Sequence, residues 1–206
     1  MEDIQDQKGV EVNLANKSRM TSQDFLVWSE SWNASERYEL VSGEIVAMSR
    51  ERNRHSLVKL DIAVALRQSV NSSGLNCTVF GDGATVFVDD STVYEPDVTV
   101  MCGGNVDLDA TTISNPCILV GVLSPSTKGV DTGGKLAGYF SLKSVMHYLV
   151  VDPKKCQITV HTRNDKEIST RIVSSGLLSF ENPELTLKID DMFTSLVQTI
   201  NPRFLC

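Results

Sequence analysis

Residues 118–127 read ILVGVLSPST, and this short run decides how the rest of the chain is interpreted. A continuous run of Ile, Leu and Val that ends in turn-forming residues is typical of a strand buried on both faces of a sheet. Gly121 interrupts the run, although glycine weakens a strand interior and offers no side chain for packing. Glycine at such a position often marks a bulge or the close approach of a ligand or another chain. The run therefore predicts a central strand with an unusual feature at Gly121.

Segments on either side of this run alternate between apolar and polar residues, which predicts further strands. They are CTVFGDGATVFVDD (77–90), TVYEPDVTVM (92–101), MHYLVVD (146–152), CQITVHTR (156–163) and EISTRIVS (167–174). Pro96 lies inside the second segment and indicates an edge, a bulge or a distorted strand. One more strand and a terminal helix near Asp190 are expected to close the chain. These runs together predict a sheet that fills most of the fold.

Three other segments have the spacing of apolar residues that is typical of helices. They are residues 21–30, where Thr21 and Asp24 form a capping pattern, about 52–70, and about 131–142. In the second helix the apolar stripe contains Val58, Ile62, Ala65 and Leu66, and Lys59 is expected to lie off it. Between the first two helices, Ser42-Gly43 predicts a hairpin turn. The pattern indicates an α/β (α+β) fold with a mixed sheet flanked by helices, a flexible tail over 1–20 and a single domain over 21–206.

Composition narrows the range of functions. The 206 residues are 41% hydrophobic and carry a net charge of −7, and no segment approaches the roughly 20 apolar residues of a membrane span. The polar, acidic N-terminus is not a secretory signal, so we expect a cytoplasmic protein with no membrane partner. The net charge argues mildly against tight, non-specific binding of duplex DNA, but three arginines between Ser49 and His55 can form a local basic face.

Five scattered cysteines, odd in number and without CxxC spacing, predict reduced thiols rather than zinc ligands or disulfides. They are Cys77, Cys102, Cys117, Cys156 and Cys206. With three histidines and no HxH or HExxH pattern, a zinc site is not expected. The glycine-containing loops match neither a dinucleotide fingerprint nor a phosphate-binding P-loop.

The remaining candidates for a catalytic site are a group of acids and a lysine. Glu95-Pro96-Asp97 lies in one predicted strand, Gly121 in the next, and Lys135 near the start of the following helix. Carboxylates on neighbouring strands can hold Mg²⁺, which lowers the pKa of a bound water. A nearby lysine can orient that water or stabilise the developing charge. Residues of these types at these places point to metal-assisted phosphodiester hydrolysis.

Five short motifs occur here in one order: YELVSGEIVAMS followed by a histidine, YEPDVTV, LVGVLSPST, an Asp-Lys-Tyr series, and HYLVVDP. In this order they resemble the bacterial family of putative restriction endonucleases, once known only as a domain of unknown function. The resemblance covers residues 21–193. It implies the PD-(D/E)XK nuclease fold, a Mg²⁺ or Mn²⁺ cofactor, and nucleic acid, in the first place DNA, as the substrate. Symmetric dimers are common, and we expect a homodimer.

The resemblance also implies roles for individual residues. Asp97 matches the metal-binding aspartate, and Lys135 matches the lysine, which has moved from the strand onto the following helix. Glu44 and His55 match positions where the family often has Glu and His. Where the family has its second acid, in the motif EVLSPST, this chain has Gly121. The predicted catalytic set is therefore Asp97, Lys135, Glu44 and His55, with Gly121 at the position of the missing glutamate.

The missing glutamate leaves two interpretations. Glu95, two residues before Asp97, would face the same side in a regular strand and is a candidate second metal ligand. Asp131 shares a helix face with Lys135 and is either another candidate or a helix cap. With such a replacement, the chain is expected to be a metal-dependent endonuclease. Without one, it is expected to be an inactive relative that binds nucleic acid or protein.

Overall fold

The run at 118–124 forms the centre of a six-stranded sheet, as the sequence predicts. This computed structural model describes residues 19–31, 36–124 and 131–200. The sheet has the order β10-β9-β8-β7-β6-β3, in which β7 is parallel to β8 and the other neighbours are antiparallel. Its strands are β3 (Cys77–Phe80), β6 (Val98–Cys102), β7 (Pro116–Val122), β8 (His147–Asp152), β9 (Gln157–Arg163) and β10 (Ile168–Val173). The predicted mixed sheet is confirmed.

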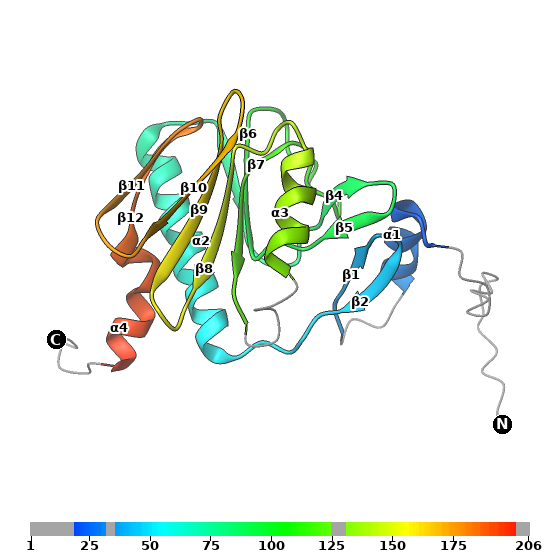
Figure 1. Ribbon diagram of the computed structural model, residues 1–206, viewed down its shortest axis with the longest axis horizontal. Helices are drawn as coiled ribbons and strands as arrows, with labels where there is room; N and C mark the ends of the chain where they lie inside the picture. Colours follow the sequence, from blue (N-terminus) through cyan, green and yellow to red (C-terminus); the bar gives the residue numbers. More distant parts are fainter. Residues whose placement is uncertain (1–18, 32–35, 125–130, 201–206) are drawn as a thin grey trace.

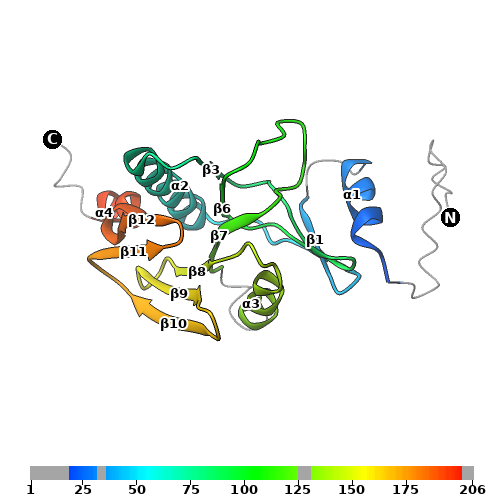
Figure 2. The same ribbon diagram turned by 90° about the horizontal axis from the view of Figure 1, so that it is seen from above.

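Alternate residues of β7 enter two separate hydrophobic cores, one on each face of the sheet. Val120 packs in the core that contains the apolar stripe of α2 (Asn53–Ser73), and Leu119 packs in the core that contains Tyr139 of α3 (Asp131–Ser141). Figure 2 shows α2 on one face and α3 on the other. The predicted stripe of α2 is buried, and Gly74 ends the helix in the left-handed conformation. Lys59 differs from its prediction, because it is 6% exposed.

A smaller sheet lies at one end of the molecule, beside α1 (Figure 1). Its order is β2-β1-β5-β4, and its strands are β1 (Tyr38–Val41), β2 (Glu44–Ala47), β4 (Val86–Asp89) and β5 (Thr92–Tyr94). The predicted hairpin joins β1 to β2, with φ of 51° at Ser42 and 80° at Gly43. The predicted cap of α1 (Ser22–Ser31) is also present, since Thr21 Oγ1 accepts a 3.1 Å hydrogen bond from the amide of Asp24.

Two of the predicted strands are each divided between the two sheets. The segment 77–90 forms β3 in the large sheet and β4 in the small one, and the segment 92–101 forms β5 and β6. Glu95-Pro96-Asp97 separates β5 from β6, because Pro96 has no amide hydrogen for a sheet ladder. The distortion expected at Pro96 is therefore a complete break between two strands, and Asp97 lies where the chain passes from one sheet to the other.

The C-terminal part adds more structure than predicted. A hairpin of β11 (Leu177–Glu181) and β12 (Glu184–Lys188) is followed by the short helix η1 (Ile189–Phe193) and by α4 (Thr194–Ile200). Apolar residues of this segment pack into the core on the α2 side of the sheet. Among the described residues, no helix combines the length and the apolar character that a membrane crossing requires. Residues 1–18 of the predicted tail lie outside the described residues.

The prediction of reduced thiols is wrong for two cysteines. Cys77 and Cys102 are directly opposite each other on β3 and β6 and form a disulfide. Cys117 and Cys156 are free. The Cys117 thiol lies 3.4 Å from the sulfur of Cys102, and burial raises its pKa to about 11. Spacing along the sequence gave no indication of this disulfide, because it depends on the pairing of two distant strands.

Candidate functional site

The candidate site lies where the turn before β6 meets the end of β7. The amide of Asp97 donates a 2.9 Å hydrogen bond to the carbonyl of Val120, and Asp97 Oδ2 accepts a 2.6 Å bond from the amide of Val122. Because Val98 pairs with Val120 in an antiparallel ladder, Asp97 stands opposite Gly121, one step beyond that pair. The backbone of β7 therefore fixes the Asp97 carboxylate at the end of the central strand.

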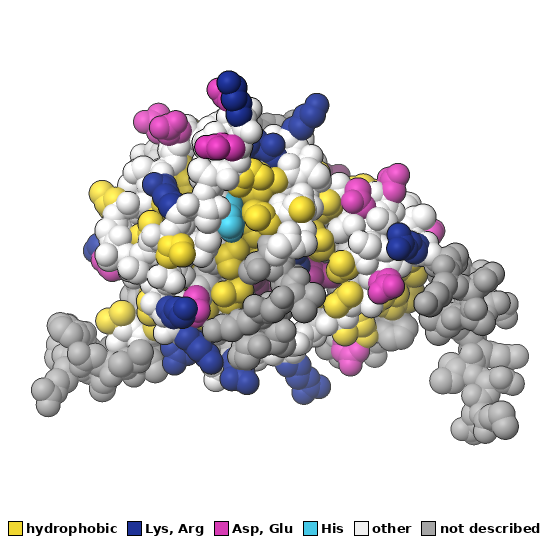
Figure 3. Space-filling view, in the orientation of Figure 1, with side chains coloured by type: hydrophobic (Ala, Val, Ile, Leu, Met, Phe, Trp, Pro, Cys, Tyr) yellow, Lys and Arg dark blue, Asp and Glu magenta, His cyan; other side chains and the backbone are white. Residues whose placement is uncertain are grey.

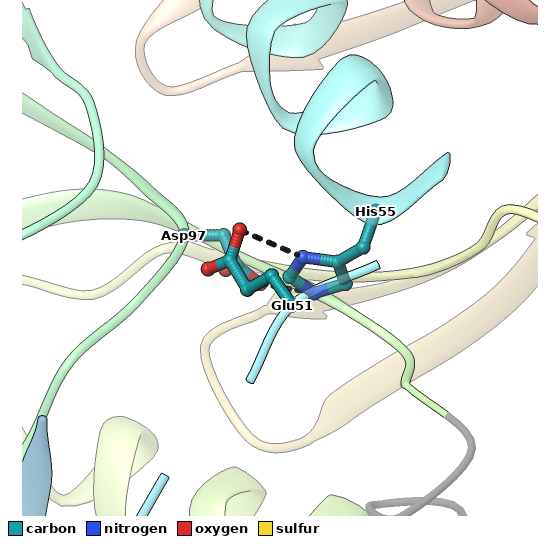
Figure 4. Close-up of side chains that lie close together, drawn as sticks. All are labelled: Glu51, His55 and Asp97. Atoms are coloured by element: carbon teal, nitrogen blue, oxygen red, sulfur yellow. Dashed lines mark ion pairs between the residues drawn. The ribbon is translucent and has the colours of Figure 1, made fainter. Parts of the chain in front are cut away.

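The beginning of α2 brings a histidine and a glutamate to the same place. His55 Nε2 lies 2.8 Å from the carbonyl oxygen of Val122. A carbonyl can only accept, so Nε2 carries the hydrogen and Nδ1 of a neutral ring presents its lone pair. Within the described part of the chain, this buried Nδ1 has no hydrogen-bond partner, and it lies 3.6 Å from Oε2 of Glu51. Figure 4 shows Glu51, His55 and Asp97 grouped in this way.

These three residues fit a divalent cation. Their ligand atoms all lie within 4.8 Å of one another. His55 Nε2 and Asp97 Oδ2 are 3.7 Å apart. Two carboxylates suit Mg²⁺ or Mn²⁺, and an imidazole favours the transition metal of the two. A buried imidazole nitrogen that lacks a partner is the donor that such an ion would use.

A buried lysine neutralises this acidic group. Lys59 Nζ lies 3.5 Å from Oδ1 of Asp97 and 2.7 Å from Oδ2 of Asp82, and it also contacts Glu51. Burial lowers the pKa of Lys59, but its hydrogen bonds to Asp82 and Glu51 outweigh this effect, so the pKa lies above its ordinary value. Lys59 is therefore charged in the folded protein, and it stabilises three carboxylates together.

Burial has the opposite effect on the carboxylate of Asp97. It raises the pKa of Asp97 above the ordinary value, although His55, the amide of Val122 and Lys59 partly oppose this change. The anionic form of Asp97 is thus held in a place that water solvates poorly. Additional positive charge near Asp97 would lower the free energy of that form.

A second network of ion pairs lies beside the first and contains two of the predicted residues. Lys135 Nζ is 2.8 Å from both oxygens of Glu39, and Oε1 of Glu39 accepts a 2.8 Å hydrogen bond from the amide of Glu95. The carboxylate of Glu95 itself contacts Arg37. Burial raises the pKa of Glu95, and Arg37 opposes that shift. Glu95 and Lys135 therefore face Arg37 and Glu39, whereas the ammonium group 3.5 Å from Asp97 belongs to Lys59.

Of the other predicted positions, Gly121 lies next to Asp97 and Glu44 lies in the small sheet. Gly121 stands opposite Asp97, and a β-carbon on Gly121 would meet the hydroxyl oxygen of Tyr148 at 3.1 Å. Glu44 is exposed in β2, the edge strand of the small sheet. The side chain of Asp131 lies outside the described residues. The structure thus brings Asp97 and His55 together, with Gly121 across the ladder.

Sequence reasoning missed five charged residues of these networks: Arg37, Glu39, Glu51, Lys59 and Asp82. One pattern could have indicated two of them. Glu51, His55 and Lys59 follow each other at intervals of four residues, which would place their side chains on one face of a helix that began at Glu51. The helix itself begins at Asn53. Arg37, Glu39 and Asp82 reach the site through tertiary contacts that leave no comparable spacing.

Comparisons with known proteins identify the family and the fold. A model of the family Uma2, described as "Putative restriction endonuclease", matches residues 22–192. An uncharacterized protein of Synechocystis sp. is 27% identical over 181 residues, which are 86% of this chain and 93% of that protein. A crystal structure from Anabaena variabilis, described as a putative nuclease belonging to DUF820, is similar with a TM-score of 0.65. It is 18% identical, and the match covers 86% of this chain and 99% of that one. This last likeness concerns the fold.

Proposed function

Because the chain belongs to the family described as "Putative restriction endonuclease", we propose that it hydrolyses phosphodiester bonds of nucleic acid with a divalent metal ion. Asp97, Glu51 and His55 would hold the ion, and Mg²⁺ or Mn²⁺ is the expected cation. One observation carries this proposal. The buried Nδ1 of His55 has no hydrogen-bond partner among the described residues, and it faces Glu51 beside Asp97. Once bound, such an ion would polarise a phosphate oxygen and make a water molecule more acidic.

Val122 is the positioning residue in this proposal. Its amide donates to Asp97, and its carbonyl accepts from His55, so one peptide segment orients both side chains. The carbonyl also selects the histidine tautomer that leaves Nδ1 available. Gly121 immediately before it adds no side chain, so the end of β7 contributes backbone contacts where the family pattern has a carboxylate.

Two lysines have different parts in the proposal. Lys59 would balance the charge of Asp97, Glu51 and Asp82 and stabilise negative charge that develops on a phosphate. Lys135 matches the family's lysine, and its proposed role is to orient the attacking water or to stabilise the developing charge. Its ammonium group lies on Glu39 and 5.4 Å from the centre of the Tyr94 ring. Glu39 would hold Lys135 beside the segment that carries Asp97.

Glu95 and Glu44 are the remaining acids of the predicted set. Glu95 would become a metal ligand only by exchanging its contact with Arg37. Glu44 has a catalytic role only through the resemblance. We propose DNA as the nucleic acid and a homodimer as the active form, since symmetric dimers are common.

A specific observation favours a second candidate function, that of an inactive relative that binds nucleic acid or protein. Gly121 has no carboxylate, and the hydroxyl of Tyr148 lies next to the space that such a side chain would need. In this alternative, Lys59 and Arg37 balance the charge of the acidic cluster without a metal ion. Metal binding and cleavage distinguish the two candidates.

Plasmid nicking in Mg²⁺ or Mn²⁺ tests the proposal. Asp97→Asn should reduce nicking by at least about a hundredfold, since loss of a metal ligand costs more than loss of a residue that only orients one. Asp165→Asn is the matched control, because Asp165 is exposed between β9 and β10. Equal nicking by both variants would contradict the proposal. No cleavage of the plasmid or of a single-stranded oligonucleotide by the unmodified protein with either metal would favour the binding module.

A further inference from the structure

A pocket of about 310 Å³ opens beside the candidate metal centre, at the start of α2. His55 belongs to both, since it lines the pocket and contributes to the cluster with Glu51 and Asp97. The remaining walls come from the segment before α2, from the end of β7 and from the turn after β8. A group seated in this pocket would therefore be a direct neighbour of a group bound at the metal centre.

The pocket is lined by four basic side chains, Arg50, Arg52, Arg54 and Lys154. Arg54 donates a 3.4 Å hydrogen bond to the carbonyl of Pro153. Over the ranges that the structure describes, the other three form no ion pair with a carboxylate. Figure 3 shows Lys and Arg side chains gathered at the lower edge of the molecule, where α2 begins in Figure 1. This local charge contrasts with the net charge of −7 for the whole chain.

The lining holds one acidic residue against these four basic ones. Asp152 is 8% exposed, and its Oδ1 accepts hydrogen bonds of 2.9 Å and 3.3 Å from the amides of Lys154 and Lys155. It therefore stabilises the turn after β8. The pocket is suited to an anion.

The size of the pocket indicates which anion. A volume of 310 Å³ lies at the lower end of the range for small-ligand pockets, about 300–1,000 Å³, and far exceeds the needs of a single phosphate. Leu123 and Pro153 provide apolar surface beside the basic side chains. An unpaired base can lie against apolar surface and guanidinium planes while its phosphate meets the cations. A base inside a duplex is stacked and paired, and cannot enter such a pocket without leaving the helix.

We infer that this basic pocket binds one unpaired nucleotide, next to the phosphodiester bond that lies at the metal centre. The inference rests on the proposed function and makes its substrate more specific. A strand whose scissile phosphate sits at Asp97, Glu51 and His55 would extend past His55 into the pocket. The protein would consequently prefer single-stranded or locally unpaired nucleic acid to intact duplex.

Two pairs of matched variants test the pocket. Lys154 and Lys155 are exposed neighbours on one turn, but only Lys154 lines the pocket. Arg52 directly precedes α2 and Arg67 lies within it, but only Arg52 lines the pocket. Each variant replaces the basic residue with Glu, so the net charge changes equally within a pair. The probe is a fluorescent oligothymidine, and its binding is followed by anisotropy with Ca²⁺ in place of Mg²⁺.

Lys154→Glu and Arg52→Glu should each weaken binding by about tenfold and lower the slope of log affinity against log salt by about 1. Lys155→Glu and Arg67→Glu should stay within about threefold of the unmodified protein, as expected for a long-range charge effect that salt screens. A blunt duplex annealed from two fully complementary strands should bind more weakly than the single strand. Equal losses within each pair, or equal binding of duplex and single strand, would overturn the inference.

Cleavage is measured separately, so that the two proposals fail in different ways. Nicking activity combined with equal losses within each pair would overturn the pocket inference and leave the proposed function intact. The predicted binding pattern without any cleavage would support the pocket and overturn the proposed hydrolysis. Far-ultraviolet circular dichroism of all four variants checks that each one folds.

Discussion

The hydroxyl oxygen of Tyr148 lies 3.1 Å from the position that a β-carbon would take on Gly121. The next nearest atoms of the ring lie at 3.7 Å and 3.8 Å, which are ordinary contact distances. The phenol of Tyr148 thus lies beside the space that a side chain at position 121 would occupy. A carboxylate side chain introduced at position 121 would have to fit against this hydroxyl as well as against the backbone.

The first prediction concerns this pair. Gly121→Glu alone should destabilise the protein by about 1–3 kcal/mol, because the new side chain overpacks against the hydroxyl of Tyr148. Gly121→Glu combined with Tyr148→Phe should recover most of that loss and bind Mn²⁺ more tightly than Tyr148→Phe alone. Thermal unfolding and calorimetric Mn²⁺ titration provide the two measurements. Gly121→Gln with Tyr148→Phe is the control, since it has the shape of glutamate without the charge, and it should bind Mn²⁺ no better than Tyr148→Phe.

The second prediction concerns the metal. Mn²⁺ should bind more tightly than Mg²⁺, because the proposed ligands include an imidazole as well as two carboxylates. His55→Gln should lower Mn²⁺ affinity by about tenfold or more and reduce the preference for Mn²⁺. Calorimetric titration with each metal measures both effects, and His161→Gln, in β9 and outside the proposed ligand set, is the control. Unchanged Mn²⁺ affinity in His55→Gln would remove this histidine from the ligand set.

The third prediction concerns the buried lysine. Lys59→Met should lower the free energy of unfolding by about 3 kcal/mol, because it leaves three carboxylates without their shared cation. Lys188→Met should cost less than about 1 kcal/mol, since its 3.9 Å ion pair with Asp191 is exposed. Urea unfolding compares the two variants. Added Mn²⁺ should stabilise Lys59→Met more than the unmodified protein, and equal stabilisation would contradict a shared charge balance.

The fourth prediction concerns pH. Burial, together with the charge of Arg171, lowers the pKa of His147 from 6.5 to about 4, although a 2.8 Å hydrogen bond to the carbonyl of Asn182 opposes the shift. The unfolded chain therefore takes up a proton at a higher pH than the folded protein does. Stability from this residue is complete above pH 6.5 and decreases as the pH falls toward 4, by about 3 kcal/mol in total. His147→Gln should show a shallower decrease over this range in urea unfolding, and identical slopes would contradict the assignment.

The fold could be predicted where local pattern and tertiary structure agree. The apolar run of β7, the hairpin at Ser42-Gly43 and the stripe of α2 carry their structure in the spacing of a few residues. The division of 92–101 between two sheets could not be read in the same way. Pro96 indicates a distortion, but the sheet that each half joins depends on partners far away in the sequence.

The site shows the same limit. The resemblance pointed to Asp97 and His55, and these two residues lie together in the structure. The burial of Lys59 was missed, because a lysine beside an apolar stripe normally extends into water. Here Glu51, Asp82 and Asp97 converge on its ammonium group from three separate segments, and no local pattern announces such a convergence.

The junction at Glu95-Pro96-Asp97 has a consequence for cooperativity. Arg37 and Glu39 belong to the start of the small sheet, whereas Asp97 and Lys59 belong to the large sheet and its helix. Their ion pairs with Asp82, Glu51 and Glu95 connect the two parts. A local opening of the small sheet would release Arg37 from Asp82 and Glu95 and Glu39 from Lys135, and so disturb the surroundings of Asp97. Amide hydrogen exchange in β1 and β5 would then report how often the site comes apart, long before the chain unfolds.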